Sequence, residues 1–293
     1  MEVNFNTLNS VDSFNDQFQI TVLTGNYNGK LKNYEKHGNL EIIRTKKFFS
    51  FDRGFVSLQL ISKFYKEAKK SDQIMIFFPL SLIFPIIFLT NKPIILNYIC
   101  LPNGKNIINK LFFIYFYIFG LVSIIKSKYV VVLTKDYFYN YKLHSFFKKK
   151  IYQILPFIEK NILTKDYINT KNSEEKIIIG FLGRLSPEKG IENIINVSNL
   201  MNKKNIFHEV IIAGNDKDIR FKKYITKLKN LSFANRSIIF SGSISENEKK
   251  VFLEKIDFLI LPSINSFEAF GLVQLEAMSF GKLVLVSDLK GVN

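Results

Sequence analysis

Residues 261–281 read LPSINSFEAFGLVQLEAMSFG, and this stretch decides how the rest of the chain is interpreted. An apolar run that begins at Phe258 breaks at Pro262 into a small polar loop, and a helical pattern begins beside Gly271. A strand, a loop and a helix in this order are typical of one crossover in a parallel α/β sheet.

Two glutamates bracket the start of the predicted helix. Glu268 lies in the loop and Glu276 lies on the helix, with Phe270 and Gly271 between them. Backbone amides at a helix N-terminus attract phosphate, and ionised carboxylates accept hydrogen bonds from sugar hydroxyls. The spacing suits a sugar nucleotide, although a plain crossover with two solvated glutamates accounts for the same pattern.

The composition indicates a globular chain with a strong positive charge. Its 293 residues are enough for two domains of ordinary size. The formal charge of +16 is compatible with nucleic acid, anionic lipid or phosphorylated substrates as partners. Lysine is spread along the whole chain, and no basic and aromatic pattern resembles a known RNA- or DNA-binding motif, so no nucleic-acid partner is expected.

Cysteine and histidine are too sparse for disulfide or metal chemistry. Cys100 is the single cysteine, which excludes an internal disulfide. His37, His144 and His208 stand in no metal-ligand spacing with one another or with Cys100. Residues 1–19 are polar and broken by Asn, Asp and Ser, so no signal peptide is expected and a cytoplasmic location is the default.

The first half of the chain alternates strand patterns with helical or apolar segments. Strands are predicted over 19–24, 73–77, 93–98 and 129–134, a helix over 55–69, and apolar segments over 80–89 and 106–125. Alternation of this kind is typical of a parallel sheet with helices on both faces.

One apolar segment in this half has two interpretations. Residues 111–125 carry no charge and are bracketed by Lys110, Lys126 and Lys128. They fall short of the about 20 residues that a helix needs to span a bilayer. The segment is either a buried core helix or an aromatic-rich helix that rests on an anionic membrane surface.

The second half repeats the alternation and carries cations in a loop. Strands are predicted over 177–182, 209–213, 237–240, 258–261 and 283–287. Arg184 and Lys189 flank the loop after the first of these strands, at the carboxyl edge of the sheet, where such sheets bind ligands. A pair of cations there fits a diphosphate. Polar residues between Pro156 and Glu175 mark the domain boundary.

Four motifs in the second half occur in the order and spacing of a known family. They are GFLGRLSPEKG at 180–190, IIAG at 211–214, FSG at 240–242 and the stretch from Pro262 to Lys282. Together they resemble the retaining glycosyltransferases of family 4. The resemblance implies the α/β GT-B fold, with two Rossmann-like doubly wound parallel-sheet domains that face each other across a cleft. It assigns residues 1–160 to the acceptor side and residues 173–293 to the donor nucleotide.

The resemblance also implies a role for each matching position. Arg184 and Lys189 would neutralise the donor diphosphate, so no obligatory metal and no other cofactor is implied. Glu268 would hold hydroxyls of the donor sugar on the reacting face, and Glu276 would bind the ribose diol. The remaining donor-binding positions are the backbone groups of Gly183, Phe270, Gly271 and Leu272.

The chain departs from the family pattern at both ends. The first strand and the Gly-rich loop of the family have no counterpart, and its closing helices would follow Asn293, so both domains are expected to be incomplete. Met75 and Phe77 stand where the family often has histidines. Ile99 stands where a histidine commonly faces the donor sugar, with Asn97 as a neighbouring polar group.

Two functions are compatible with these features. The first is a bacterial-type enzyme that transfers a sugar from a UDP- or GDP-sugar to a cell-surface polysaccharide or lipid-linked acceptor with retention of configuration. It would work in the cytoplasm, in peripheral contact with the inner face of an anionic plasma membrane. The second is a truncated or degenerate GT-B remnant that binds nucleotide sugar without turnover. The intact donor motifs favour the enzyme, and the missing Gly-rich loop and histidine favour the remnant.

Overall fold

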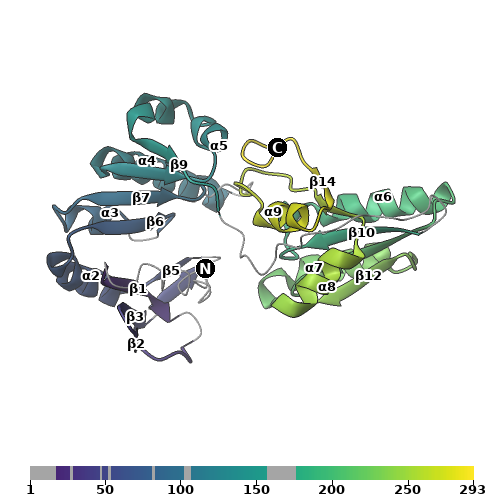
Figure 1. Ribbon diagram of the computed structural model, residues 1–293, viewed down its shortest axis with the longest axis horizontal. Helices are drawn as coiled ribbons and strands as arrows, with labels where there is room; N and C mark the ends of the chain where they lie inside the picture. Colours follow the sequence, from purple (N-terminus) through teal and green to yellow (C-terminus); the bar gives the residue numbers. More distant parts are fainter. Residues whose placement is uncertain are drawn as a thin grey trace. The chain divides into compact units, whose positions relative to one another are not determined.

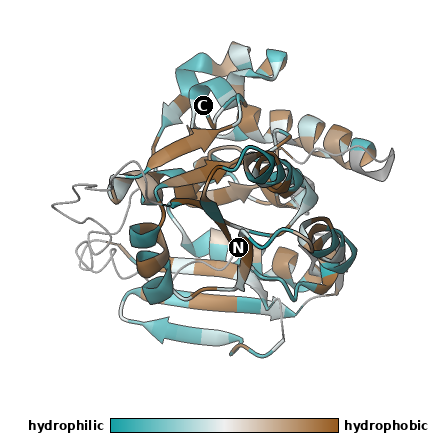
Figure 2. Ribbon diagram, turned by 90° about the vertical axis from the view of Figure 1, so that its right-hand side faces the viewer, coloured by the Kyte–Doolittle hydropathy of each residue, from teal (hydrophilic) through white to brown (hydrophobic). Residues whose placement is uncertain are grey.

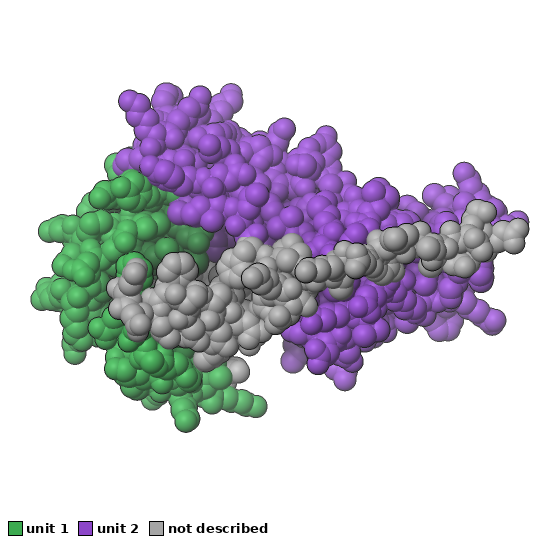
Figure 3. Space-filling view, viewed as in Figure 1, with its two compact units in different colours: residues 1–97, 118–130 green, residues 98–117, 131–293 purple. Residues whose placement is uncertain are grey.

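The computed structural model describes residues 18–156 and 176–293, apart from 27–28, 47, 52–53, 81–82 and 102–106. The chain divides into two compact units (Figure 3), the first of residues 1–97 and 118–130 and the second of residues 98–117 and 131–293. The domain boundary expected between residues 160 and 173 lies outside the described residues.

The second unit contains a five-stranded parallel sheet in the order β12-β11-β10-β13-β14 (Figure 1). The strands are β10 (Ile177–Leu182), β11 (His208–Ala213), β12 (Ile238–Gly242), β13 (Phe258–Leu261) and β14 (Leu283–Val286). The strand order reverses at β10, which has β11 on one side and β13 on the other. The predicted doubly wound sheet is therefore confirmed, and the carboxyl ends of β10 and β13 flank its topological switch point.

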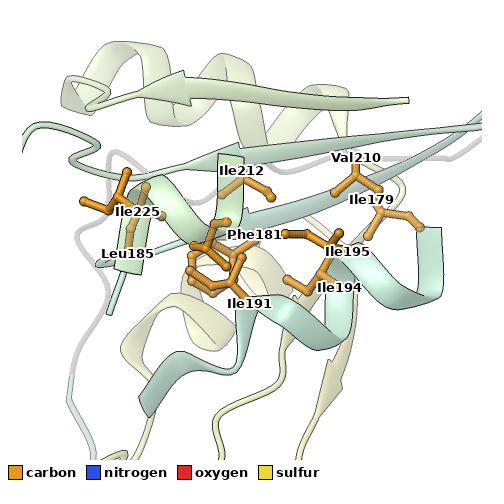
Figure 4. Close-up of a cluster of buried hydrophobic side chains, with 10 residues drawn as sticks. Ile179, Phe181, Leu185, Ile191, Ile194, Ile195, Val210, Ile212 and Ile225 are labelled. Carbon is orange, nitrogen blue, oxygen red and sulfur yellow. The ribbon is translucent and has the colours of Figure 1, made fainter. Parts of the chain in front are cut away.

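Helices cover both faces of this sheet, because successive strand residues point to opposite sides. Ile178 packs in one core with Phe252, whereas its neighbour Ile179 packs in a second core with Ile195 and Ile225 (Figure 4). The central strands are mainly hydrophobic, and most helices have a hydrophobic and a hydrophilic side (Figure 2). The helices are α6 (Ile191–Lys203), α7 (Lys222–Ser232), α8 (Glu246–Lys255) and α9 (Leu272–Ser279).

The start of the described chain forms a small mixed sheet. Its order is β1-β3-β2, formed by β1 (Ile20–Asn26), β2 (Tyr34–His37) and β3 (Leu40–Lys46). β1, which was predicted, is parallel to β3, which was not, and β2 is antiparallel to β3. The two-residue loop between them begins with Gly38 at φ 56°, a conformation that glycine adopts without strain. The sequence prediction missed this antiparallel hairpin.

The predicted elements that follow are confirmed to within a few residues. A four-stranded sheet has the order β6-β7-β8-β9. The predicted helix begins three residues later than expected, because Gly54–Val56 forms a strand, β5, paired with β4 (Phe49–Phe51). The remaining elements are α2 (Leu58–Lys70), β6 (Ile74–Phe78), α3 (Ile83–Phe88), β7 (Ile94–Tyr98), α4 (Ile107–Lys126), β8 (Tyr129–Val132), α5 (Lys135–Tyr139), a 3-10 segment (Lys142–Lys150) and β9 (Ile151–Gln153).

The apolar helix α4 is buried on one side only. Phe116 and Ile124 are buried, and Gly120 lies against the ring of Phe78. The opposite side exposes large apolar side chains, namely Leu111, Ile114, Ile118 and Ile125. Within the part of the chain that the structure describes, no helix has both the length and the apolar character to cross a membrane.

Candidate active site

The loops that follow β10 and β13 touch each other through their backbones. The amide of Ile264 donates a hydrogen bond of 2.9 Å to the carbonyl oxygen of Glu188. A Cβ atom on Gly190 would collide with the carbonyl oxygen of Pro262, and its φ of 62° also favours glycine. This close approach joins the predicted cation loop to the predicted glutamate loop at the switch point of the sheet.

Lys189 and Glu268 form an ion pair at this junction. The Lys189 ammonium donates to Oε2 of Glu268, which also accepts a hydrogen bond of 3.1 Å from the Ser263 hydroxyl. The side chains of Lys189 and Glu268 are only 13% and 12% exposed. Because two groups donate to one of its oxygens and little water reaches it, the Glu268 carboxylate has a fixed orientation. The structure thus brings together two residues that the sequence predicted, and adds Ser263, which it did not.

Arg184 lies on the solvent side of the same loop. Its side chain is 45% exposed, and Nη2 lies 3.9 Å from Oε1 of Glu188. The hydroxyl of Ser186 donates to the same oxygen at 2.7 Å. The pKa of Asp218 is lowered mainly by hydrogen bonds from Arg220, with a smaller effect from the charge of Arg184. Arg184 is therefore the accessible cation of the loop, and Lys189 is the enclosed one.

Glycines keep the neighbouring loops at this edge of the sheet in contact. The amide of Gly183 donates to the carbonyl oxygen of Ala213 at 3.0 Å, and the amide of Gly214 donates to that of Gly242 at 2.8 Å. A Cβ atom on Gly214 would collide with the carbonyl oxygen of Gly183. The glycines of the first three motifs therefore have a packing role beside the candidate site.

The helix α9 begins at the other side of the site, as predicted. Gly271 precedes it with φ 78°, and a Cβ atom there would collide with Leu261. No described side chain caps the helix, so its first amides are suited to an anion. Phe270 is buried and accepts a hydrogen bond from the buried Gln274 side chain, while Leu272 is exposed.

Glu276 has its own partner on α8. Its Oε1 lies 2.9 Å from the ammonium of Lys249, which also lies 2.7 Å from Oε2 of Glu246. Burial alone would lower the pKa of Lys249, but the two carboxylates raise it above its ordinary value. Lys249 therefore stays charged and orients Glu276. Sequence reasoning missed this lysine, because nothing local links it to a helix that begins later in the chain.

The positions that depart from the family pattern lie on other strands. Met75 and Phe77 of β6 are 54% and 50% exposed, and Ile99, just after β7, is half-buried. Among the described residues, no group of three or more His, Cys, Asp or Glu side chains is arranged to hold a metal ion.

Comparison with known sequences points to one family. Residues 164–293 match the family described as "Glycosyl transferases group 1". An uncharacterized glycosyltransferase of Methanocaldococcus jannaschii is 31% identical over 138 residues, which cover 45% of this chain and 33% of that protein. The chain therefore spans about a third of the length of this curated relative.

Two examples represent the solved structures that are similar in fold. The sucrose-phosphate synthase of Thermosynechococcus elongatus has a TM-score of 0.68 at 13% identity, covering 94% of this chain and 72% of that one. HepE of Anabaena, in complex with UDP and glucose, has a TM-score of 0.60 at 15% identity, covering 87% and 69%. Residues 164–293 thus match the glycosyl transferases group 1 family, and the chain has the α/β fold of GT-B glycosyltransferases.

Proposed function

We propose that the chain is a retaining glycosyltransferase of the family 4 type that uses a UDP- or GDP-sugar as donor. The acceptor is a growing cell-surface polysaccharide or a lipid-linked glycan. The observation that carries the proposal is the contact between Lys189 and Glu268 at the switch point of the sheet. A cation beside a carboxylate suits a ligand in which a diphosphate is joined to a sugar. The UDP and glucose in the complex of Anabaena HepE are ligands of this class.

In the proposed complex, the two cations of the first loop face the diphosphate. Arg184 and Lys189 stabilise the negative charge that develops on the leaving nucleoside diphosphate. Lys189 then shares its charge between the diphosphate and Glu268, whose second oxygen accepts hydrogen bonds from the donor sugar. Water is excluded where these side chains are enclosed, which strengthens both interactions.

The nucleoside part of the donor lies against α9 in this proposal. Glu276 binds the ribose diol, and Lys249 keeps its carboxylate oriented. The backbone amides of Phe270, Gly271 and Leu272 contact the phosphates at the start of the helix. Arginine and lysine supply the positive charge, so donor binding and transfer are expected to proceed unchanged in EDTA.

The test measures hydrolysis or transfer with UDP-glucose, UDP-N-acetylglucosamine and GDP-mannose as donors. Glu268→Ala and Lys189→Ala should each lower kcat at least about 100-fold on the donor that the wild type uses. Lys227→Ala, an exposed lysine paired with Glu192, serves as the control and should keep full activity. Unchanged activity in both site variants would contradict the assignment of Glu268 and Lys189 to the active site. Binding of donors without any turnover would favour the alternative, a GT-B remnant that binds nucleotide sugar but does not transfer it.

A peripheral contact with anionic lipid on the cytoplasmic side is part of this proposal. The exposed apolar side chains of α4 lie on a helix with Lys110 and Lys126 near its two ends. Basic and apolar groups on one helix suit a membrane interface. Wild-type protein should sediment with phosphatidylserine-containing vesicles more than with phosphatidylcholine vesicles, and Ile114→Ser with Ile118→Ser should abolish the difference.

A further inference from the structure

The short helix α5 has no part in the proposed donor site, yet it contacts the loop that carries Glu268. The hydroxyl of Tyr137 donates a hydrogen bond of 2.9 Å to the carbonyl oxygen of Ser266. The same hydroxyl accepts a hydrogen bond of 2.9 Å from the amide of Leu101. Ser266 lies two residues before Glu268, and all four residues belong to the second unit. One phenol oxygen therefore links the segment after β7 to the glutamate loop.

A second contact holds the other side of the same loop. Oδ2 of Asp136, also on α5, accepts a hydrogen bond of 2.8 Å from the amide of Gly291. A Cβ atom on Gly291 would collide with the carbonyl oxygen of Ala269 and lie 2.8 Å from Cβ of Tyr137. Ala269 directly follows Glu268 in sequence. The backbone is therefore packed on both sides of the glutamate by α5 and the glycine bound to it.

Both contacts persist over a wide pH range. Tyr137 is 3% exposed, and burial raises the pKa of its phenol well above the ordinary value, so the hydroxyl keeps its proton. Burial alone would raise the pKa of Asp136, but hydrogen bonds from the amides of Gly291 and Tyr137 hold it below its ordinary value. The phenol thus remains a donor and the carboxylate remains an acceptor at neutral pH.

We infer that Tyr137 is a positioning residue for Glu268, whose hydroxyl fixes the loop through Ser266 and so sets where the carboxylate meets the donor sugar. The inference rests on the proposed function for the role of Glu268. A side chain on a loop must be held within about 0.5 Å of its working position to be effective. A hydrogen bond from a buried, rigid ring to the loop backbone meets this requirement at low entropic cost.

The variant Tyr137→Phe keeps the ring and removes only the hydroxyl. Calorimetry of the 293-residue chain measures the binding of UDP-glucose, UDP-N-acetylglucosamine, GDP-mannose, UDP and GDP. The variant should bind the preferred nucleotide sugar about tenfold more weakly, the scale of one lost hydrogen bond. It should bind the matching nucleoside diphosphate as the wild type does, because that ligand has no sugar for Glu268 to hold. Tyr139→Phe, on the same helix, is the control and should change neither affinity.

A double-mutant cycle tests whether the effect passes through Glu268. In a Glu268→Gln background, Tyr137→Phe should cause no further loss of nucleotide-sugar affinity, since coupled residues are non-additive. Independent, additive losses would overturn the inference. Equal weakening of nucleotide sugar and nucleoside diphosphate would also overturn it, because a general loss of structure affects both.

Hydrogen exchange separates this inference from the proposed function. If the wild type binds no nucleotide sugar, the proposed function fails. The contact between Tyr137 and the loop is then tested by the exchange rates of backbone amides in the wild type and in Tyr137→Phe. The Leu101 amide, which donates to the phenol, should exchange at least about tenfold faster in Tyr137→Phe, and the amides of residues 267–271 should also exchange faster. Unchanged exchange at both places would show that the hydroxyl does not fix the loop.

Discussion

The ammonium of Lys189 meets the carboxylate of Glu268 across 79 residues of sequence. Both side chains are mostly enclosed, so water can satisfy either charge only in part if the other is removed. An enclosed ion pair of this kind costs more to break than an exposed one.

The first prediction concerns the stability of this pair. Lys189→Met should lower the free energy of unfolding by about 2 kcal/mol, because among the described residues it leaves Ser263 as the one hydrogen-bond donor to the Glu268 carboxylate. The double variant Lys189→Met with Glu268→Gln should regain part of this loss. The side chain of Lys227 is 59% exposed, so Lys227→Met should lower the free energy of unfolding by less than about 0.5 kcal/mol. Urea denaturation measures all three, and equal losses at the two lysines would contradict the prediction.

The second prediction concerns the close approach of the two loops. Gly190→Ala combines an unfavourable φ with a collision against the backbone of Pro262, which cannot move aside as a side chain can. Gly242→Ala has a similar φ of 73°, but the nearest atom lies at an ordinary contact distance of 3.6 Å. A positive φ alone costs a non-glycine residue about 1 kcal/mol, and this cost applies to both variants. Gly190→Ala adds the collision, so urea denaturation should show a clearly larger loss in the free energy of unfolding for it than for Gly242→Ala. Equal losses would mean that the loops are not in backbone contact.

The third prediction concerns a buried histidine outside the site. His144 is fully buried and stacks on Phe138 with a centroid distance of 4.4 Å. Burial lowers its pKa from 6.5 to about 4, against the opposing effect of a hydrogen bond to the Phe138 carbonyl oxygen.

The unfolded chain therefore binds a proton at a higher pH than the folded chain does. The free energy of unfolding should fall as the pH drops from about 6.5 to about 4, by at most about 3 kcal/mol from this group. Below pH 4 both states carry the proton and the effect levels off. His144→Phe should remove this part of the pH dependence, while His37→Ala, at an exposed histidine, should keep it. Denaturation curves between pH 4 and 7.5 provide the measurement.

The fourth prediction concerns Lys249, which pairs with Glu276. Lys249→Met should weaken the binding of UDP or GDP about fivefold by calorimetry, because the Glu276 carboxylate loses the partner that orients it. The neighbouring Lys250→Met tests the loss of a positive charge without the loss of this contact, and should retain wild-type affinity. An effect of the same size in both variants would assign it to net charge instead.

Local patterns predicted the five-stranded sheet of the second unit well, because its strands are short apolar runs, four of which end at Gly or Pro, and they alternate with helices. The rule that parallel sheets bind ligands at their carboxyl edge placed Lys189 and Glu268 in neighbouring loops, and the structure pairs them. The hairpin between β2 and β3 was missed, although its turn contains Gly38.

Other features had no local signal. The contact of Tyr137 with Ser266 joins residues 129 positions apart, and that of Lys249 with Glu276 joins residues 27 positions apart. Neither residue type is unusual in its own segment, so only tertiary packing reveals the partner. The charged loop residues were visible as candidates, but the groups that orient them were not.

The position of β10 between β11 and β13 has a consequence for synthesis on the ribosome. β10, β11 and β12 leave the ribosome first and can pair in the order in which they appear. The other edge of β10 must wait for β13, and until then it presents unpaired backbone groups that favour aggregation. The arrival of the segment that ends in the Glu268 loop therefore covers this edge of β10 and brings Glu268 to Lys189 in the same step, while β13 takes over as the unpaired edge until β14 follows.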